Sequence, residues 1–391
     1  MATTYDPDNA LAPCPPAGWN SYNSFGGVYP MPDDVDPDLP GGVGLDQRVI
    51  VQTAEAMVSS GLLQAGYVYL NLDDRWQDPR RPRDAAGILR ADPRRFPDGM
   101  AALGRRLHEL GLRFGLYTIA NQLACGGEEG SGPDGFPLTG SLGREVVDAW
   151  TFAEWGVDFL KIDWCGVDEA GNRGRAEEVF ATWNQAIQAT GRPIVLSAST
   201  WGHEREVAWA PRLAHLWRTG EDLPPRWEAV WEAAHRQASP PWRDVCGPQT
   251  GWNDPDMLEV GRPGLSLDES WTHLVLAALT ASPLLTSHDI RRQDPAIAAL
   301  LLDRDILALN RSDAPVATFQ AEPDGWEVWR RTGSDGSTHQ AVVNLADRPR
   351  PLPDRLVLPG REIGPPERLV LGQAPPHGVR LTVVEAAPRL D

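Results

Sequence analysis

The chain has 391 residues, of which 41% are hydrophobic and 23% are charged, a composition typical of a soluble globular protein with room for one large domain and a small one. Its formal net charge of -18 argues against nucleic acid or an anionic membrane surface as the partner. Residues 1–16 lack the basic and apolar regions of a signal peptide, and no apolar run is long enough to span a bilayer, so we expect a cytoplasmic protein unless a leader has been trimmed away.

From residue 16 to residue 290, short apolar segments alternate with stretches whose apolar residues recur at helical spacing. The expected strands lie at 16–25, 67–74, 113–121, within 155–165, and at 193–200, 216–223, 251–261 and 282–290. The expected helices lie at 46–60, 99–110, 143–155, around Val179–Ile187, and at 268–281. Eight strands separated by helical segments predict an α/β fold, a closed (β/α)8 barrel of the TIM type. An open doubly wound sheet is the alternative, which we disfavour because no glycine fingerprint follows the first strand.

From about Pro315 the pattern changes to strands without helical spacing. Residues 326–329 and the segment QAVVNLA flank a GSDGS turn at 333–337, which predicts a hairpin. Further strands are expected at 356–358, 369–371 and 379–384. The chain therefore divides into a barrel at 1–312 and a small C-terminal antiparallel β-sandwich domain at 313–391.

Within segment 155–165, Lys161 and Asp163 occupy alternate positions of a strand and therefore point to the same face. Lys161 is the only lysine, since all the other 35 residues among the 36 Lys and Arg are arginine. This usage suggests that the position needs a compact ammonium group. A buried cation beside a carboxylate is costly unless the two are paired or used. From these residues alone, a functional pair and a structural ion pair are equally good interpretations.

The loops that follow the strands form the active site in barrels of this kind, so polar residues at the strand ends are the candidates. Together they predict a carboxylate-rich bowl with aromatic walls and two cations. Its members are Trp19, Asn20, Asp73, Asp74, Tyr117, Lys161, Asp163, Thr200, Trp201, Arg218, Asp222, Asp254 and Asp256.

Three functions fit this bowl. In a glycosidase, Asp163 would be the nucleophile, kept ionised because Lys161 lowers its pKa, and Asp222 would be the proton donor, oriented by Arg218. In a Mg2+-dependent lyase or isomerase, the aspartates would bind the ion and Lys161 would be the base. In a sugar-binding protein without catalysis, the bowl would only supply hydrogen bonds. Zinc is not expected, because the spacings HxH and HExxH do not occur. From these residues alone, the glycosidase is slightly favoured over the other two functions.

Eight segments follow one another along the barrel: GWNSYNSFG at 18–26, YLNLDDRW at 69–76, RFPDGM at 95–100, LHELGLRFGLYT at 107–118, WGVDFLKIDWC at 155–165, WRTGED at 217–222, NDPDML at 253–258 and SPLLTSHDI at 282–290. In this order they resemble the motifs of the retaining α-galactosidases, or melibiases, of glycoside hydrolase family 27. The resemblance covers the whole barrel and implies an exo-glycosidase that removes terminal α-D-galactosyl residues from oligosaccharides or glycoconjugates. It implies no cofactor, no metal and no nucleic-acid or membrane partner, with a homo-oligomer as one possible assembly.

Carried onto the matching positions, the resemblance implies a role for most members of the bowl. Asp163 would be the nucleophile and Asp222 the acid/base of a double displacement. The implied contacts with the sugar are Asp73 and Asp74 at O4 and O6, Lys161 at O3 and O4, Arg218 at O2, Trp19 in the wall, Tyr117 orienting the nucleophile, and Asp256 at the rim.

One departure from the family pattern concerns the sugar 2-position. Many members read Cys-Glu-Trp after the fifth strand, with the Glu near that position, whereas this chain reads Ser199, Thr200 and Trp201. Relatives that accept N-acetylgalactosamine carry a small hydroxyl residue there, but they pair it with a residue smaller than His203. The alternative activity is therefore an α-N-acetylgalactosaminidase or a related pyranosidase, with Thr200 and Trp201 beside the sugar.

A second departure concerns cysteine. The residue after the paired aspartates is Arg75 rather than the cysteine that relatives often carry, so one family disulfide is missing. Cys125 and Cys165 match another family pair, which we expect to be bonded or, in a reducing cytoplasm, to be two thiols.

Overall fold

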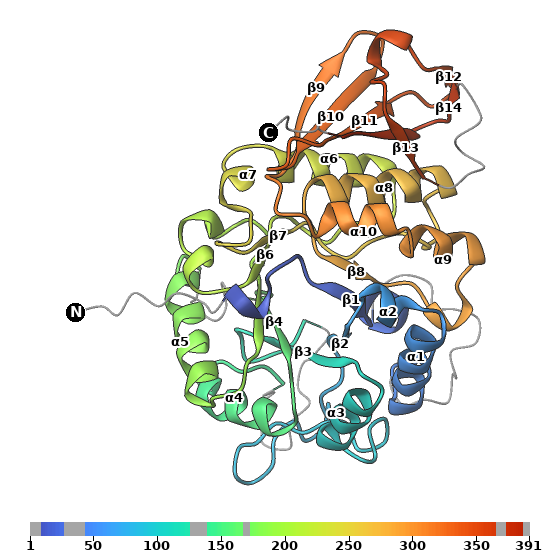
Figure 1. The fold of residues 1–391 in the computed structure, drawn as a ribbon. Coiled ribbons are helices and arrows are strands. Elements are labelled where there is room, and N and C mark those ends of the chain that lie inside the picture. The colour runs from blue at the N-terminus through green and yellow to red at the C-terminus, as the bar shows by residue number, and fades with distance from the viewer. Residues whose placement is uncertain (1–8, 27–43, 126–138, 167–172, 365–372, 386–391) are drawn as a thin grey trace.

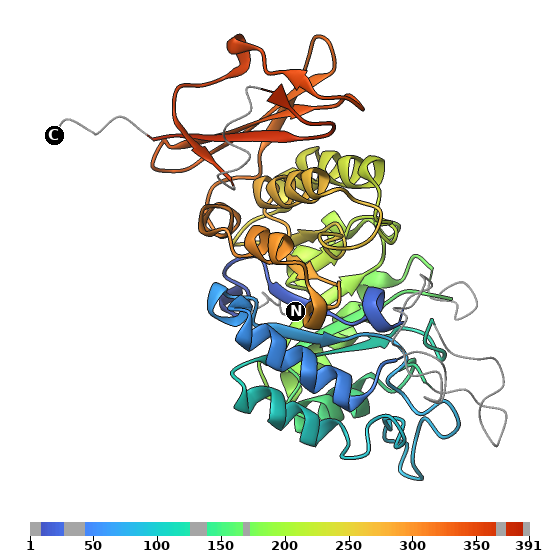
Figure 2. The same cartoon turned by 90° about the vertical axis from the view of Figure 1, so that its right-hand side faces the viewer.

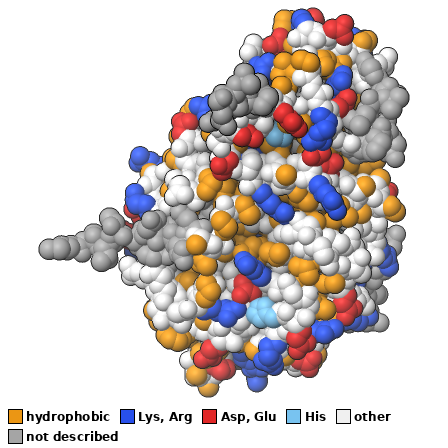
Figure 3. All heavy atoms as spheres, in the orientation of Figure 1, with side chains coloured by type: hydrophobic (Ala, Val, Ile, Leu, Met, Phe, Trp, Pro, Cys, Tyr) orange, Lys and Arg blue, Asp and Glu red, His pale blue; other side chains and the backbone are white. Residues whose placement is uncertain are grey.

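The computed structural model describes residues 9–26, 44–125, 139–166, 173–364 and 373–385. Figure 1 shows two parts, a barrel surrounded by helices and a smaller antiparallel sheet that covers one side of it. In these residues no helix is both long and apolar enough to cross a membrane. On the face seen in Figure 3, the coloured basic side chains are interspersed with acidic ones on both parts.

Eight strands form one parallel sheet in the order β7-β6-β5-β4-β3-β2-β1-β8. After β7 the chain runs beside β8, where the Leu258 N–H donates to the Leu285 carbonyl at 2.8 Å and Leu258 pairs in parallel with Thr286. These contacts close the sheet into the predicted (β/α)8 barrel, and the open-sheet alternative is wrong. The strands are β1 (Ala17–Asn20), β2 (Tyr69–Leu72), β3 (Arg113–Ile119), β4 (Phe159–Asp163), β5 (Val195–Ser199), β6 (Leu216–Arg218), β7 (Trp252–Asp254) and β8 (Leu284–Thr286).

The helices expected from the sequence are present close to their predicted bounds. The first begins where Asp46 caps it by accepting from the Val49 N–H at 2.7 Å, and its apolar stripe, including Ile50 and Met57, is buried. The α-helices are α1 (Gln47–Ser59), α2 (Leu62–Ala65), α3 (Met100–Glu109), α4 (Glu145–Glu154), α5 (Ala176–Ala189), α6 (Trp227–Ala238), α7 (Trp242–Val245), α8 (Leu267–Leu279), α9 (Pro295–Leu301) and α10 (Arg304–Asn310).

Helix α8 lies between the barrel and the C-terminal sheet, as Figures 1 and 2 both show. It begins with a capping box, in which Ser266 and Glu269 satisfy each other's backbone N–H groups. From Ser270 to Leu279 every residue is buried. A helix that is buried all round needs cover on its outer face, and the C-terminal sheet provides it.

The C-terminal part consists of a five-stranded antiparallel sheet in the order β13-β15-β11-β10-β9 and a two-stranded sheet of β12 and β14. The predicted hairpin is confirmed, since β10 pairs with β11 from Trp326 and Asn344 to Thr332 and Thr338. The strands are β9 (Thr318–Glu322), β10 (Trp326–Thr332), β11 (Thr338–Asn344), β12 (Arg350–Pro351), β13 (Arg361–Ile363), β14 (Gln373–Ala374) and β15 (Val379–Val384).

One predicted strand of this part is wrong. Asp354–Leu356 forms a 3-10 turn, and residues 357–358 continue from it outside any strand. Pro351, Pro353 and Pro359 lie in and around this segment, and proline has no N–H with which to extend a ladder. The strand predicted at 369–371 lies outside the described residues, and the boundary between residues 312 and 313 stays a prediction.

A buried arginine joins the C-terminal sheet to the barrel. Arg331 of β10 is 1% exposed and its guanidinium lies at the carboxyl ends of α8 and α10, where helix carbonyls carry partial negative charge and need donors. It donates to the carbonyls of Pro315 at 3.1 Å, Ala278 at 2.6 Å, Leu309 at 2.7 Å, Ser312 at 3.1 Å and Ala314 at 2.8 Å.

Replacing Arg331 by methionine is expected to lower the free energy of unfolding by about 3 kcal/mol or more, because buried carbonyls lose their charged donor. The measurement is the midpoint of chemical denaturation. The neighbouring Arg330 is exposed and contacts Gln340, so Arg330→Met should change the stability by about 0.5 kcal/mol or less. Equal losses in the two variants would contradict the role of Arg331.

Candidate active site

The carboxyl ends of the barrel strands bring the predicted polar residues to one end of the barrel. Because Lys161 and Asp163 alternate on β4, both point inward, next to residues from the ends of β2, β6 and β7. Most of these side chains are buried, while Lys161 and Trp201 are half-buried and Asp222 is exposed. The buried ones are Trp19, Asn20, Asp73, Asp74, Tyr117, Asp163, Thr200, Arg218, Asp254 and Asp256.

The Lys161 ammonium group bridges two carboxylates. Its Nζ lies 3.0 Å from Asp73 Oδ2 and 3.8 Å from Asp163 Oδ2, and Asn20 also donates to Asp73 Oδ2 at 2.7 Å. Burial alone would lower the pKa of Lys161, but the charges of Asp73 and Asp163 outweigh it and hold the pKa well above its usual value. Lys161 is therefore a permanent cation that holds the ends of β2 and β4 together.

The predicted lowering of the Asp163 pKa is wrong. Burial of the carboxyl group raises its pKa, and this effect outweighs the opposing influence of Lys161. The lysine lies nearer to Asp73, whose own negative charge adds to the rise. The pKa of Asp163 in the free protein thus lies above the ordinary aspartate value.

A second cation, Arg218, organises the opposite side of the bowl. Its Nη1 lies 3.0 Å from Asp256 Oδ1, and its Nη2 donates to Asp222 Oδ1 at 3.1 Å, so the predicted contact with Asp222 is confirmed. Asp256 also accepts from the Leu223 N–H at 2.8 Å and donates its own N–H to Asp254 Oδ1 at 3.0 Å. The two aspartates therefore shape the turn after β7 and also face a cation.

The carboxyl groups around Arg218 differ in exposure and in pKa. The side chain of Asp222 is 66% exposed, and although burial raises its pKa, Arg218 and Lys161 together bring the pKa below the ordinary value. Asp256 is buried, and burial raises its pKa to about 6 against the influence of Arg218. Asp222 is therefore the accessible, ionised carboxyl at the mouth of the bowl.

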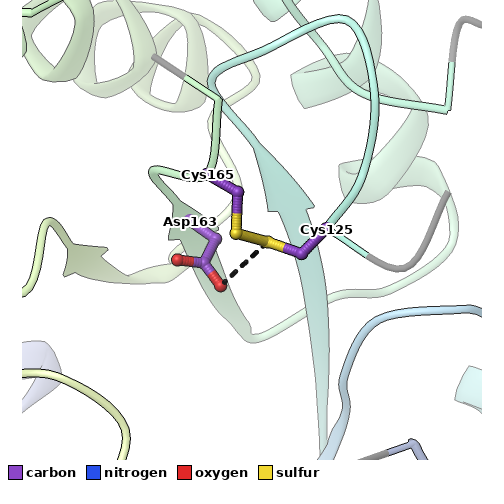
Figure 4. A group of neighbouring side chains, drawn as sticks. All are labelled: Cys125, Asp163 and Cys165. Carbon is purple, nitrogen blue, oxygen red and sulfur yellow. Dashed lines mark hydrogen bonds between the residues drawn. A yellow bond between two sulfur atoms is a disulfide. The ribbon is translucent and has the colours of Figure 1, made fainter. Parts of the chain in front are cut away.

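Cys125 and Cys165 form a disulfide beside Asp163 (Figure 4), with their Cα atoms 5.7 Å apart. Cys125 Sγ lies 3.8 Å from Asp163 Oδ2, and the Tyr117 hydroxyl donates to the same sulfur at 3.2 Å. The bonded state is the first of the two predicted possibilities. Among the described residues, these two sulfurs and Asp163 are also the sole cluster of three or more closely spaced potential metal ligands, but bonded sulfurs offer no thiolate to a metal.

Trp19, which was expected in the wall of the bowl, is buried, and a second aromatic residue, Tyr22, lies beside Lys161. Trp19 is fully buried, and its indole N–H donates to the His288 carbonyl at 2.8 Å. Tyr22 lies in the π-helical turn Tyr22–Gly26 directly after β1, with Lys161 Nζ 5.8 Å from the centre of its ring. Burial and the charges of Asp222 and Asp73 raise the pKa of Tyr22 to about 12. The aromatic side chain that faces the bowl from β1 is therefore Tyr22, which the sequence analysis missed.

The Thr200 hydroxyl is hydrogen-bonded to a buried carboxyl group. It is fully buried and donates to Glu206, whose carboxyl has no exposed surface and a pKa raised by burial. Trp201 adopts φ 59° and its ring lies 6.2 Å from that of His203. No signal in the sequence pointed to Glu206. The placement of Thr200 and Trp201 beside the sugar 2-position stays a prediction.

The sequence profile of the family described as Alpha galactosidase A matches residues 14–312. The chain belongs to this family. Alpha-galactosidase A of Cellvibrio japonicus is 33% identical to it over 349 residues, which cover 86% of this chain and 77% of that protein. Alpha-galactosidase of Cyamopsis tetragonoloba is 35% identical over 342 residues, which cover 87% of this chain and 75% of that protein. The crystal structure of alpha-galactosidase I from Mortierella vinacea matches with a TM-score of 0.77 and 25% identity, over 96% of this chain and 98% of that one.

Membership in the Alpha galactosidase A family makes the chain a glycoside hydrolase with an oligosaccharide substrate. This confirms the family resemblance and the glycosidase function predicted from the sequence. The two alternatives, a Mg2+-dependent lyase or isomerase and a non-catalytic sugar-binding protein, are wrong. The roles of the individual residues stay predictions.

Proposed function

We propose that this chain is a retaining exo-glycosidase that hydrolyses terminal α-D-galactosyl residues of oligosaccharides or glycoconjugates. The observation that carries this proposal is a pair of aspartates in contrasting settings, Asp163 buried beside Lys161 and Asp222 exposed beside Arg218. Curated relatives that match over most of the chain are α-galactosidases, which supports galactose as the sugar.

The proposed reaction has two steps. Asp163 attacks the anomeric carbon and forms an ester bond to it while the glycosidic bond breaks, and Asp222 gives its proton to the leaving oxygen. Asp222 then takes a proton from water, which attacks the same carbon and releases Asp163. Each step inverts the anomeric centre, so the product keeps the α configuration.

The proposed reaction requires the protonation state of Asp222 to change when the substrate binds. Asp222 must be protonated to act as an acid, yet its pKa is lowered in the free protein, where most of its side chain is exposed. A sugar bound at the mouth removes water from Asp222, and loss of hydration raises the pKa of a carboxyl group. Asp163 is already buried, so binding alters its hydration much less. Substrate binding thus favours the working combination of an ionised Asp163 and a protonated Asp222.

The proposed sugar contacts use the charged groups already described. Asp73 and Asp74 accept from the O4 and O6 hydroxyls, and Lys161 donates near O3 and O4. Arg218, held by Asp256, donates to O2. Tyr22 forms the wall above Lys161, in the place first assigned to Trp19.

A second candidate sugar is N-acetylgalactosamine. The observation that favours it is Thr200, which stands where many relatives carry a glutamate. The structure weakens this candidate, because the Thr200 hydroxyl is engaged by Glu206 and has no exposed surface.

The test of the proposed function compares nitrophenyl α-galactoside with its 2-acetamido analogue. We expect kcat/KM to be at least roughly tenfold higher for the galactoside, a discrimination that one added group in a fitted pocket can supply. Nitrophenyl β-galactoside serves as the control and should not be cleaved. Preference for the acetamido sugar would make the second candidate correct, and turnover of neither α-glycoside would refute both.

Replacing Asp222 by alanine should slow substrates with poor leaving groups most, since they depend on protonation of the leaving oxygen. Added azide should restore turnover and yield the α-galactosyl azide, because the intermediate on Asp163 still forms and azide then replaces water. In the Asp163→Gly variant, azide should instead attack directly and yield the β anomer. Identical anomers from the two variants, identified by NMR, would contradict the assignment.

Replacing Lys161 by methionine should move the acidic limb of the pH profile of kcat/KM to higher pH. Asp163 must be ionised, so activity falls as the pH drops through its pKa, and Lys161 opposes the rise of that pKa. Without the lysine the pKa rises further. Arg113→Met, at the exposed start of β3, is the control and should leave the limb in place. An unmoved limb in the Lys161 variant would show that the lysine does not act on the nucleophile.

A further inference from the structure

A cavity of about 480 Å3 lies at the same end of the barrel as the candidate active site. Its walls come from the segments that follow β1, β6, β7 and β8, and they include none of the residues assigned to the chemistry. The volume falls within the range of pockets that bind small molecules. The loops at this end of a barrel build substrate sites, so the cavity has the position of a binding site.

Three of the segments that line the cavity also carry residues of the candidate active site. Asn23 directly follows Tyr22, Pro225 follows Asp222 on the same loop, and Gly261 follows the turn of Asp256. The chain therefore passes from the bowl to the cavity at three separate points, and the two spaces are neighbours.

Buried and partly buried hydrogen bonds hold these walls together. The Asn23 side chain donates to Glu259 Oε1 at 2.8 Å and to Ser287 Oγ at 2.9 Å, which joins the segments after β1, β7 and β8. Glu259 is fully buried and receives Arg262 Nη1 on its other oxygen at 2.6 Å. These bonds therefore fix the positions of the segments that line the cavity, and they hold the charged side chain of Arg262 in its wall.

The position of Asp222 relates this cavity to the reaction. An acid that protonates the leaving oxygen must lie on the leaving-group side of the sugar. Asp222 is at the exposed mouth of the bowl, and Pro225, on the same short segment after β6, already lines the cavity. Under the proposed function the leaving group lies on the Asp222 side of the sugar, and the loop after β6 runs from Asp222 to the cavity wall at Pro225.

The lining suits a neutral saccharide. The lining carries two arginines and two aspartates. Arg262 is paired with Glu259 and Asp289 with Arg291, so the wall has little net charge. His288 adds no charge, because burial lowers its pKa. Apolar surfaces can pack on the C–H faces of sugar rings, while amide groups bond to hydroxyls. The apolar lining residues are Pro225, Pro263 and Ile297, and the amides are Asn23 and Gln293.

We propose that this cavity is the subsite for the leaving-group saccharide, so that the enzyme recognises oligosaccharides by at least one sugar unit beyond the scissile bond. This inference rests on the proposed α-galactosidase activity. It predicts that the part of the substrate that is not galactose contributes to kcat/KM through the cavity and not through the bowl.

The test fills the cavity without touching the bowl. Pro263→Trp and, from another wall, Gln293→Trp are compared with the wild type on two substrates. The first is α-galactosyl fluoride, whose leaving group reaches no subsite, and the second is a trisaccharide with a terminal α-galactose. We expect kcat/KM for the trisaccharide to fall roughly tenfold, about 1.4 kcal/mol, with little change for the fluoride.

A matched control fills a cavity at the other end of the barrel. Gln188→Trp projects into a space of about 230 Å3 near the end of α5 and the start of β5, and it should leave both substrates unaffected. Equal losses on fluoride and trisaccharide, or no loss on either in both variants, would overturn the subsite. If the wild-type protein cleaves neither substrate, the proposed function itself fails.

Discussion

The end of this barrel is stabilised by two cations, the half-buried Lys161 and the buried Arg218, which neutralise several neighbouring carboxylates. Lys161 joins Asp73 to Asp163, and Arg218 joins Asp256 to Asp222. Aspartates buried at this density would repel one another and lose their hydration, so each cation must lie within contact distance of two of them. The two cations also divide the bowl, with the ends of β2 and β4 on one side and the loops after β6 and β7 on the other.

The choice of a single lysine follows from this geometry. An ammonium group is compact and can lie between two carboxylates from different strands while tyrosine rings pack around it, as Tyr22 and Tyr117 do. Arg218 meets the opposite need, because its planar fork can reach two carboxylates and a backbone carbonyl at fixed angles. Where a fork of donors is useful elsewhere in the chain, as at Arg331 between two helix ends, arginine is again used.

The sequence predicted the barrel well because strand alternation and helical spacing are local properties. It predicted the members of the bowl because polar residues at strand ends are visible in the order of the chain. It could not predict the pKa of Asp163, which depends on burial and on sharing Lys161 with Asp73, a partner 88 positions away from that lysine. The strand expected at 356–358 failed because prolines around it remove the donors of a ladder.

Loop geometry explains why the sequence analysis missed Tyr22 and Glu206 at the site. Tyr22 reaches the bowl because the chain after β1 turns in a π-helical turn, and periodicity gives no sign of such a turn. Thr200 is turned toward Glu206 by a loop in which Trp201 and Arg205 both adopt a left-handed conformation, rare for residues other than glycine. The alternation of side chains along a strand therefore predicts their orientation only up to the last inter-strand hydrogen bond. It does not predict how side chains point in the loop that follows.

The contrast between the two candidate catalytic carboxyls links the site to its surroundings. The side chain of Asp163 is 10% exposed and has lost most of its hydration, whereas the side chain of Asp222 is 66% exposed and still hydrated. In the free protein the pKa of Asp163 is raised and the pKa of Asp222 is lowered. The reaction needs the opposite, an ionised Asp163 and a protonated Asp222. A ligand that covers Asp222 reverses the order, and a leaving-group saccharide held in the neighbouring cavity would cover it more completely than galactose alone. Recognition of the leaving group and activation of the acid would then be one event, because both depend on excluding water from the same side chain.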